Sequence, residues 1–166
     1  NLLVSDKGYR GVIIQLYRNF SNISVEGNEI CASSGALLSQ IAAAARNASL
    51  TGFEFAGGIP GTLGGAVFMN AGAYGGELKD VLKEAVVMTE QGEILTLPVE
   101  KLDMGYRTSR IKKAGYLVLE ARLVLEQGDM DKIRDITKDL TEKRVSKQPL
   151  EYPSAGSTFK RPEGYF

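Results

Sequence analysis

Short runs of hydrophobic residues, many of them β-branched, alternate with polar turns along most of the chain. Residues 11–16 are rich in β-branched residues, and we predict a strand there. Residues 23–26 and 29–32 flank Gly27 and Asn28, a pair typical of tight hairpin turns. A second hairpin is predicted for residues 82–89 and 93–97, which flank Glu-Gln-Gly, and a further strand for residues 116–126.

Two stretches repeat apolar residues at helical spacing. The first spans residues 36–47, and its predicted apolar face consists of Leu37, Leu38, Ile41, Ala44 and Ala45. The second begins after Asp129, a good N-cap residue, and is apolar at positions 133, 136 and 140. Residues 98–102 should form a turn or short helix. Hairpins mixed with two helices, without steady βαβ alternation, favour an α+β fold.

Residues 51–77 contain nine of the 19 glycines and no Lys or Arg. Glycine adopts positive φ and lets a ligand or another backbone approach closely. We expect no ordinary helix or strand here, but a buried, tightly turned segment whose N–H groups face an anion. A flexible linker is the alternative that its many apolar residues disfavour. Tight packing of irregular backbone without a ligand stays open.

Composition limits the possible functions. The 166 residues, 43% hydrophobic, are enough for one large domain, or for one domain and a piece of another. Twenty basic and twenty acidic residues cancel, so no overall field favours nucleic acid or membrane. The chain has no histidine, which excludes Ser-His-Asp and Cys-His hydrolases and most catalytic zinc sites. Its one cysteine, Cys31, excludes an internal disulfide and is expected to be a small buried residue.

Two polar clusters follow the glycine-rich segment. Tyr106 and Arg107 precede Ser109, and a guanidinium can grip a carboxylate or phosphate through two hydrogen bonds. Residues 154–160 form a turn of small residues with hydroxyl groups beside Lys160, which could bind an anion or supply a proton. For each cluster a plain surface role remains open.

The order of these motifs resembles one protein family along the whole chain. The pieces that carry the resemblance are NLLVSD, FAGGIPGTLGGAVFMNAGAYGGE, GYRTS and SAGSTFKRP. Together they are similar to the UDP-N-acetylenolpyruvoylglucosamine reductases. The resemblance implies an α+β FAD-binding domain of the PCMH/vanillyl-alcohol-oxidase-like type, with a mixed or antiparallel sheet and flanking helices.

The resemblance also implies a function. The expected enzyme is a cytoplasmic bacterial flavoprotein of peptidoglycan synthesis, and so of cell-wall growth, cell shape and division. It uses FAD, with NADPH as hydride donor, to reduce UDP-N-acetylglucosamine enolpyruvate to UDP-N-acetylmuramate. No metal, nucleic acid, membrane or obligatory protein partner is implied. The alternatives are a non-catalytic nucleotide- or flavin-binding module and another FAD-linked oxidoreductase of the same fold.

The resemblance assigns roles to individual residues. Arg107 would stabilise charge on the substrate carboxylate, Ser157 would supply a proton, and Tyr106 and Lys147 would contact substrate. Expected FAD contacts are Ser34, Gly35, Gly57, Gly58, Ile59, Pro60, Gly61, Thr62, Gly64, Gly65, Ala71, Gly72 and Ala73.

The same resemblance gives the expected domain organisation. Residues 1–147 would be an FAD-binding domain without its N-terminal part, and residues 148–166 the start of a C-terminal substrate-binding domain. The family's catalytic glutamate has no counterpart here, and Arg161 stands where the family often has Asn. We therefore expect the chain alone not to turn over substrate.

Overall fold

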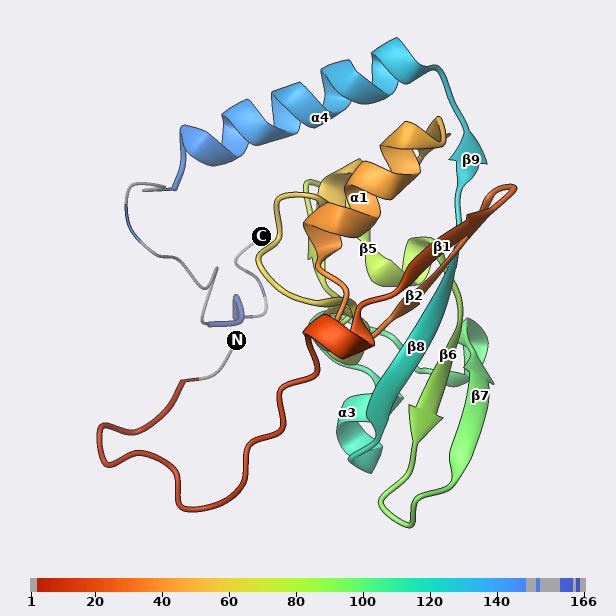
Figure 1. Ribbon diagram of the computed structural model, residues 1–166. Coiled ribbons are helices and arrows are strands. Elements are labelled where there is room, and N and C mark those ends of the chain that lie inside the picture. The colour runs from red at the N-terminus through yellow and green to blue at the C-terminus, as the bar shows by residue number, and fades with distance from the viewer. Residues whose placement is uncertain (1–2, 149–151, 153–158, 163, 165–166) are drawn as a thin grey trace.

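The computed structural model describes residues 3–148, 152, 159–162 and 164. Its centre is a five-stranded sheet in which every neighbouring pair is antiparallel, in the order β1-β2-β8-β6-β7 (Figure 1). These strands are β1 Ile23–Glu26, β2 Glu29–Ser33, β6 Leu82–Met88, β7 Ile94–Pro98 and β8 Leu117–Val124. Both predicted hairpins and the α+β class are confirmed.

Alternate residues of the central strands form the buried face of the sheet. Ile30 of β2 pairs with Leu123 of β8, and Ala121 of β8 pairs with Ala32 on one side and Ala85 on the other. All five side chains are at most 1% exposed. The three alanines leave room for a helix, and α2 (Leu63–Met69) packs on β8 at this face.

The opposite face of the sheet is polar. Glu29 accepts hydrogen bonds from Lys83 and from Arg122, and Arg122 also pairs with Glu84 at 3.3 Å. Cys31 lies on the same strand as Glu29 and is only half-buried, rather than fully buried as expected. Partial burial, followed by the Glu120 carboxyl, raises the pKa of its thiol to about 11.

Both predicted helices are confirmed. Helix α1 (Leu38–Asn47) begins two residues later than predicted and lies against β1 and β2. Helix α4 (Met130–Val145) crosses above α1 and the short helix η2 (Glu54–Ala56), as Figure 1 shows. Asp129 caps α4 by accepting hydrogen bonds from the amides of residues 131 and 132, both at 3.0 Å. Only Ile133 of α4 is fully buried.

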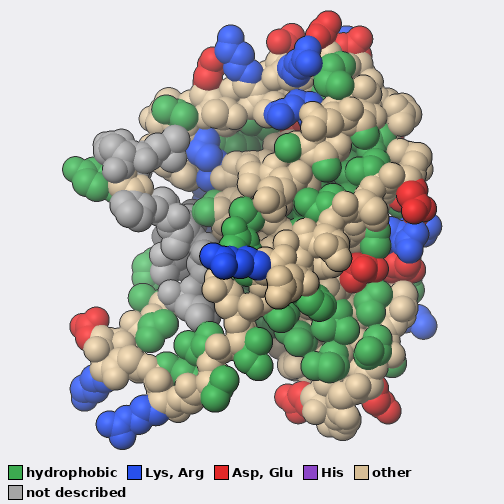
Figure 2. Space-filling model, viewed as in Figure 1, with side chains coloured by type: hydrophobic (Ala, Val, Ile, Leu, Met, Phe, Trp, Pro, Cys, Tyr) green, Lys and Arg blue, Asp and Glu red, His purple; other side chains and the backbone are tan. Residues whose placement is uncertain are grey.

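The predicted strand at residues 11–16 is wrong. These residues have no regular secondary structure, and Val12, Ile13 and Ile14 are 85%, 61% and 80% exposed. Figure 2 shows hydrophobic side chains uncovered along the first part of the chain, beside the main body. A strand needs a partner for its backbone groups, and among the described residues none pairs with this run.

The prediction of no ordinary helix or strand in the glycine-rich segment is also wrong. Helix α2 lies inside it, followed by a small ladder of β4 (Gly72–Ala73) and β5 (Gly76–Glu77). Leu63, Ala66 and Val67 of α2 are buried. Their packing on the sheet stabilises the helix despite two glycines, because tertiary burial outweighs intrinsic propensity.

Shorter elements complete the chain. The predicted strand at 116–126 divides in two, because β8 ends at Val124 and β9 (Glu126–Gln127) pairs with β3 (Leu50–Thr51) in a separate ladder. The predicted turn or short helix at residues 98–102 is confirmed as η4 (Val99–Lys101). The remaining short helices are η1 Arg18–Phe20, η3 Leu78–Asp80 and α3 Arg110–Ala114. In the described part of the chain, no helix is both long and apolar enough to cross a membrane.

Candidate functional site

The glycine-rich segment is tied by its backbone to the residues that open α1. Leu38 donates to the Gly61 carbonyl at 3.2 Å, and Leu63 donates to the Ala36 carbonyl at 2.9 Å. Gly64 donates to the Ser34 carbonyl at 2.8 Å. The structure therefore places Ser34 and Gly35, two expected cofactor contacts far away in sequence, beside the turn at Gly61–Gly64.

Close approach explains two of these glycines. A Cβ at Gly64 would lie 2.8 Å from the Ser34 Cβ, and one at Gly35 would lie 2.5 Å from the Phe20 carbonyl oxygen. Real Cβ atoms do not come so near, so a larger side chain at Gly64 would push the glycine-rich segment away from Ser34, and one at Gly35 would displace the backbone at Leu16 and Phe20. Gly57 is similar but less tight, with 3.1 Å to the Ala42 Cβ.

Several polar groups of this region have no partner among the described residues. The amides of Gly58, Gly61 and Thr62 donate to no described protein group. The Ser34 hydroxyl is buried and makes no hydrogen bond in the described structure. Next to them, a Cβ at Gly61 or Gly65 would meet nothing within 4 Å. Open space beside free N–H groups is the arrangement that an oxyanion needs.

The other expected FAD contacts of the segment lie on either side of α2. Ile59 is half-buried and Pro60 is exposed. Ala71 donates to the Ala66 carbonyl at 2.8 Å and so continues the end of α2, while Gly72 and Ala73 form β4. The Gly72 carbonyl accepts a hydrogen bond from Arg107, in the next part of the site.

Arg107 lies in a turn that is fastened to the glycine-rich segment. Gly105 and Thr108 exchange two backbone hydrogen bonds, at 3.1 and 3.2 Å, around Tyr106 and Arg107. The Arg107 Nη1 donates to the Asn70 carbonyl at 3.2 Å, and Nη2 donates to the Gly72 carbonyl at 2.7 Å. Its φ of 53° is uncommon for a residue other than glycine and is typical of functional sites.

Tyr106 lies between Arg107 and the last described residues. The Arg107 guanidinium carbon is 5.0 Å from the centre of the Tyr106 ring. The Tyr106 hydroxyl accepts from the Arg161 amide at 3.3 Å, and the Tyr106 carbonyl accepts from Lys160 Nζ at 3.4 Å. The end of the GSTFK motif thus contacts the Arg107 turn.

Two expected site residues are not brought to this turn by any described contact. Ser157 lies outside the described residues. Lys147 is exposed just after α4. Their expected roles therefore stay predictions.

Glu77 and Asn70 form the polar base beneath Arg107. The Glu77 carboxylate pairs with Lys79 at 2.8 Å and accepts from the Asn70 side chain at 3.1 Å. The Lys79 ammonium is the main cause that holds the pKa of Glu77 below its usual value; burial opposes it, and the hydrogen bond from the Asn70 amide adds a smaller lowering effect. Glu77 is therefore a fixed negative charge near the guanidinium.

Sequence reasoning missed a contact between α4 and the glycine-rich segment. A Cβ at Gly58 would lie 2.7 Å from Arg144 Nε, and this Nε is buried without a described partner. The two residues border a hollow of ≈ 320 Å³ between α1, α4 and the segment, which also includes Arg46 and Tyr74. In the sequence, Arg144 is indistinguishable from the other basic residues at the end of a helix.

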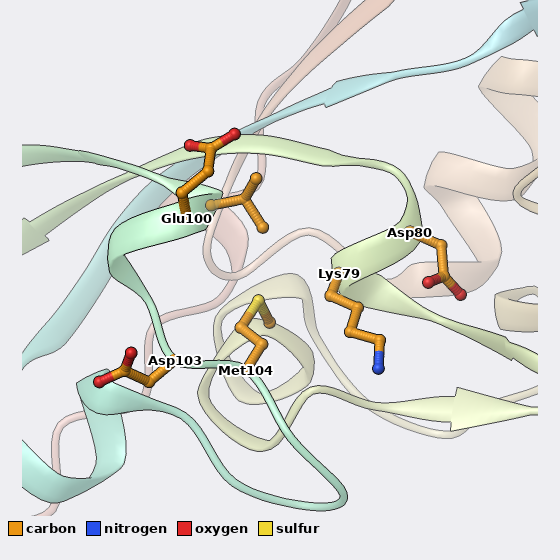
Figure 3. Close-up of a pocket in the computed structure, with 6 residues that line it drawn as sticks. Lys79, Asp80, Glu100, Asp103 and Met104 are labelled. Carbon is orange, nitrogen blue, oxygen red and sulfur yellow. The ribbon is translucent and has the colours of Figure 1, made fainter.

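A second hollow, of ≈ 420 Å³, is shallow and is bordered by Asp103 and Met104, which precede the Arg107 turn in the sequence (Figure 3). Its carboxylates, Asp80, Glu100 and Asp103, point away from one another in the close-up, and Met104 points toward the middle. Carboxylates in this arrangement do not form an acid–base pair. Among the described residues, no group of three or more acidic or thiol side chains could hold a metal ion.

The free groups of the first site fit a flavin dinucleotide. The diphosphate of FAD is an anion, and the amides of Gly58, Gly61 and Thr62 are hydrogen-bond donors without a partner among the described residues. The buried Ser34 hydroxyl offers a further donor. The open space at Gly61 and Gly65 leaves room for a bulky group against the backbone.

Comparison with known proteins also indicates an FAD-binding domain. The family described as FAD binding domain matches residues 1–98. Over all 166 residues the chain is 55% identical to UDP-N-acetylenolpyruvoylglucosamine reductase from Alkaliphilus oremlandii and 60% identical to the protein of the same name from Clostridium botulinum strain Eklund 17B. It spans 55% and 54% of those two proteins.

A solved structure agrees with the fold. The crystal structure of UDP-N-acetylenolpyruvylglucosamine reductase (MurB) from Thermus caldophilus is 32% identical and superposes with a TM-score of 0.76. The alignment covers 88% of this chain and 52% of that one, so the chain spans about half the length of the relatives that it matches. The family match, the fold and the unpaired groups around the glycines agree, and the chain belongs to the family of FAD-binding domains.

Proposed function

We propose that the protein carrying this chain is a UDP-N-acetylenolpyruvoylglucosamine reductase, a cytoplasmic flavoenzyme of bacterial peptidoglycan synthesis. It would use NADPH to reduce UDP-N-acetylglucosamine enolpyruvate to UDP-N-acetylmuramate. The observation that carries the proposal is 55–60% identity along the whole chain to two proteins of that name. In this proposal residues 1–147 bind FAD, and residues 148–166 begin a substrate-binding domain.

The glycine-rich segment and the start of α1 would hold the cofactor. The free amides of Gly58, Gly61 and Thr62 would donate to the diphosphate, with the Ser34 hydroxyl close to the same turn. The close contact of Gly64 with Ser34 keeps the two segments together. Bound FAD supplies the hydride chemistry that no side chain of the protein can provide.

Arg107 would bind the carboxylate of the enolpyruvyl group. Two of its five N–H donors are used by the carbonyls of Asn70 and Gly72, which leaves three for a substrate. Reduction of the double bond builds negative charge beside the substrate carboxylate, and a fixed guanidinium stabilises that charge. The Tyr106 ring, stacked beside the guanidinium, would contact the substrate, and Lys147 would meet its diphosphate.

Ser157 would complete the reaction by giving a proton to the carbon beside the carboxylate. A serine hydroxyl is a weak acid, but a carbanion-like centre is a strong base, so a neutral donor held close is sufficient. Lys160, three residues after Ser157 in the sequence, contacts Tyr106, and this supports the assignment. The contact brings the end of the same motif to the Arg107 turn.

Rapid mixing of the FAD-loaded protein separates the two half-reactions and tests this function. We expect Arg107→Lys and Ser157→Ala to leave flavin reduction by NADPH within about twofold of wild type. Transfer from reduced flavin to the enolpyruvyl substrate should slow by about 10²–10⁴-fold. Arg110→Lys, an exposed arginine three residues away, is the matched control and should change neither step.

Two results would oppose the proposal. Equal slowing of both half-reactions would mean that Arg107 and Ser157 act on flavin binding or folding. Tight FAD binding without any substrate-dependent oxidation of NADPH would favour the alternative, a non-catalytic flavin-binding module.

A further inference from the structure

Asn70 is the most completely bonded polar side chain near Arg107. It is 0% exposed and ends α2 in the left-handed conformation, with φ 45° and ψ 61°. Its Nδ2 donates to Glu77 at 3.1 Å and to the Gly105 carbonyl at 3.0 Å. Its Oδ1 accepts from the Lys79 amide at 3.0 Å. Both amide hydrogens and the amide oxygen are therefore used.

Two of the Asn70 hydrogen bonds reach the Arg107 turn, one at its backbone and one at the guanidinium. The side chain holds the Gly105 carbonyl, at the base of the turn, while the Asn70 main-chain carbonyl receives Arg107 Nη1 at 3.2 Å. Gly105 is also one of the two residues whose backbone hydrogen bonds close the turn. One residue thus fixes both the backbone that carries Arg107 and the end of its guanidinium.

Capping of α2 does not explain this side chain. A helix C-terminus requires a residue that tolerates positive φ, and glycine meets that need at least as well as asparagine. The cap itself uses the Asn70 backbone N–H, which donates to the Ala66 and Val67 carbonyls. None of the three side-chain hydrogen bonds contributes to the cap.

We propose that Asn70 is a positioning residue for Arg107: its side chain holds the Gly105–Thr108 turn so that the guanidinium points its free N–H groups at the substrate carboxylate. The proposal rests on the proposed function for the identity of that substrate. Its geometric half, that Asn70 orders the turn, stands on the described hydrogen bonds alone.

Two substitutions separate the side chain from the backbone conformation. Asn70→Gly keeps the left-handed backbone accessible and deletes all three side-chain hydrogen bonds. Asn70→Asp keeps the size but replaces the Nδ2 donor by an oxygen that faces Glu77 and the Gly105 carbonyl. Asn28→Asp is the matched control, because Asn28 Nδ2 also donates to a backbone carbonyl, that of Leu125 at 3.2 Å, outside the site.

Amide hydrogen exchange tests the geometric half without any activity assay. In both Asn70 variants the amides of Gly105 and Thr108 should exchange about tenfold faster, because the turn loses its side-chain support. Amides of the central strand β8 should be unchanged in each variant and serve as the measure of intact folding. Wild-type exchange at Gly105 and Thr108 in a folded Asn70 variant would overturn the proposal.

Half-reaction kinetics test the catalytic consequence. Asn70→Gly should slow transfer to the enolpyruvyl substrate by about 10²-fold, since misplacement of a catalytic group costs that much, and leave flavin reduction by NADPH unchanged. Adding Arg107→Lys should then cost little more, because the two residues act as one unit. Equal slowing of both half-reactions, or fully additive losses, would overturn the positioning role.

The two proposals can fail separately. Asn70 variants with wild-type kinetics, beside a slow Arg107→Lys, would overturn the role of Asn70 and leave the proposed function standing. If Arg107→Lys itself transferred to substrate at the wild-type rate, the proposed role of Arg107 would fail, and hydrogen exchange would still decide whether Asn70 orders the turn.

Discussion

At the scale of single residues, two adjacent glycines of α2 have opposite surroundings. A Cβ at Gly64 would lie 2.8 Å from the Ser34 Cβ, whereas one at Gly65 would meet nothing within 4 Å. The first glycine therefore serves the contact between two protein segments. The second faces the open side on which we propose that FAD lies.

Alanine variants of these two glycines should differ in unfolding free energy. Alanine at either position gains the same helix propensity, so this effect cancels between the two variants. The remaining difference is the clash with Ser34, and Gly64→Ala should be less stable than Gly65→Ala by about 1–3 kcal/mol in urea unfolding without cofactor. Equal stabilities would contradict the close contact at Gly64.

Glu77 gives a prediction in acid. Its folded-state pKa is held below the usual 4.5, mainly by Lys79, so folding favours the charged form. The contribution is present above pH 4.5 and is lost as the pH falls through the lower folded-state pKa. Glu77→Gln should flatten the loss of unfolding free energy below pH 4.5, measured by urea titrations at several pH values. Glu100→Gln, at an exposed site, is the control. If Glu77→Gln left the pH dependence of the unfolding free energy as steep as the control does, this role of Glu77 would be contradicted.

The residues of the candidate site could be predicted from sequence motifs, but the residues that hold them in place could not. GYRTS and the glycine-rich segment indicated Arg107 and its neighbours, and the structure brings Arg107 to Gly72. Asn70 and Arg144 carried no such signal. Their contacts, with Gly105 and Gly58, cross between elements far apart in the chain and exist only once the fold is formed.

At the scale of elements, Ser109 joins α3 to α2. Its hydroxyl donates to the Phe68 carbonyl at 2.7 Å and accepts from the Lys112 amide at 3.3 Å as the N-cap of α3. Ser109 is 0% exposed. The Arg107 turn is thus held between Asn70 on one side and a capped helix on the other.

Loss of the Ser109 hydroxyl should be costly. Ser109→Ala removes a helix cap and leaves the partly buried Phe68 carbonyl without this donor, so unfolding free energy should fall by about 1–3 kcal/mol. Ser146→Ala, which removes an exposed hydroxyl bonded to the Lys143 carbonyl, should change it by less than about 0.5 kcal/mol. Similar losses for the two variants in urea unfolding would contradict the linking role of Ser109.

Element prediction succeeded where a local pattern is sufficient. Gly27 and Asn28 mark a hairpin, and Asp129 marks the start of α4, because turns and caps depend on adjacent residues. The pattern failed for residues 11–16, because β-branched residues favour a strand but do not provide a second strand to pair with it. It failed again at α2, where burial against β8 outweighs the cost of two glycines.

At the scale of the whole molecule, two groups of apolar residues have opposite surroundings. Nearly all the buried apolar residues of the described chain lie in one core between the sheet and helices α1 and α2. The apolar run at residues 11–16 instead lies uncovered beside the body (Figure 2). The first group stabilises the described fold, and the second adds no burial to it.

This division can be measured in the 166-residue chain. Val12→Ser combined with Ile14→Ser should change the unfolding free energy by less than about 0.5 kcal/mol, since both side chains are at least 80% exposed. Leu123→Ala in β8, where the side chain is 0% exposed, should cost about 2–5 kcal/mol. Urea unfolding measures both variants, and a large loss of unfolding free energy in the double serine variant would show that the run is buried in solution.

The α+β class and the FAD-binding fold could both be predicted from the sequence, the first from element order and the second from motif order. The strand order β1-β2-β8-β6-β7 could not, because β2 and β8 are joined by contacts such as Ile30 with Leu123 that no local pattern encodes. That pairing brings Ala32, Ala121 and Ala85 side by side on β2, β8 and β6, where α2 packs on β8.

We propose that this FAD-binding chain belongs to a reductase of the enolpyruvyl sugar nucleotide, and one anaerobic measurement tests this most directly. The full-length protein that carries the chain is loaded with FAD and reduced with one equivalent of NADPH, and UDP-N-acetylglucosamine enolpyruvate is then added. We predict that the visible absorption of oxidised flavin returns and that UDP-N-acetylmuramate forms in equal amount. Flavin that stays reduced after the substrate is added would contradict the account.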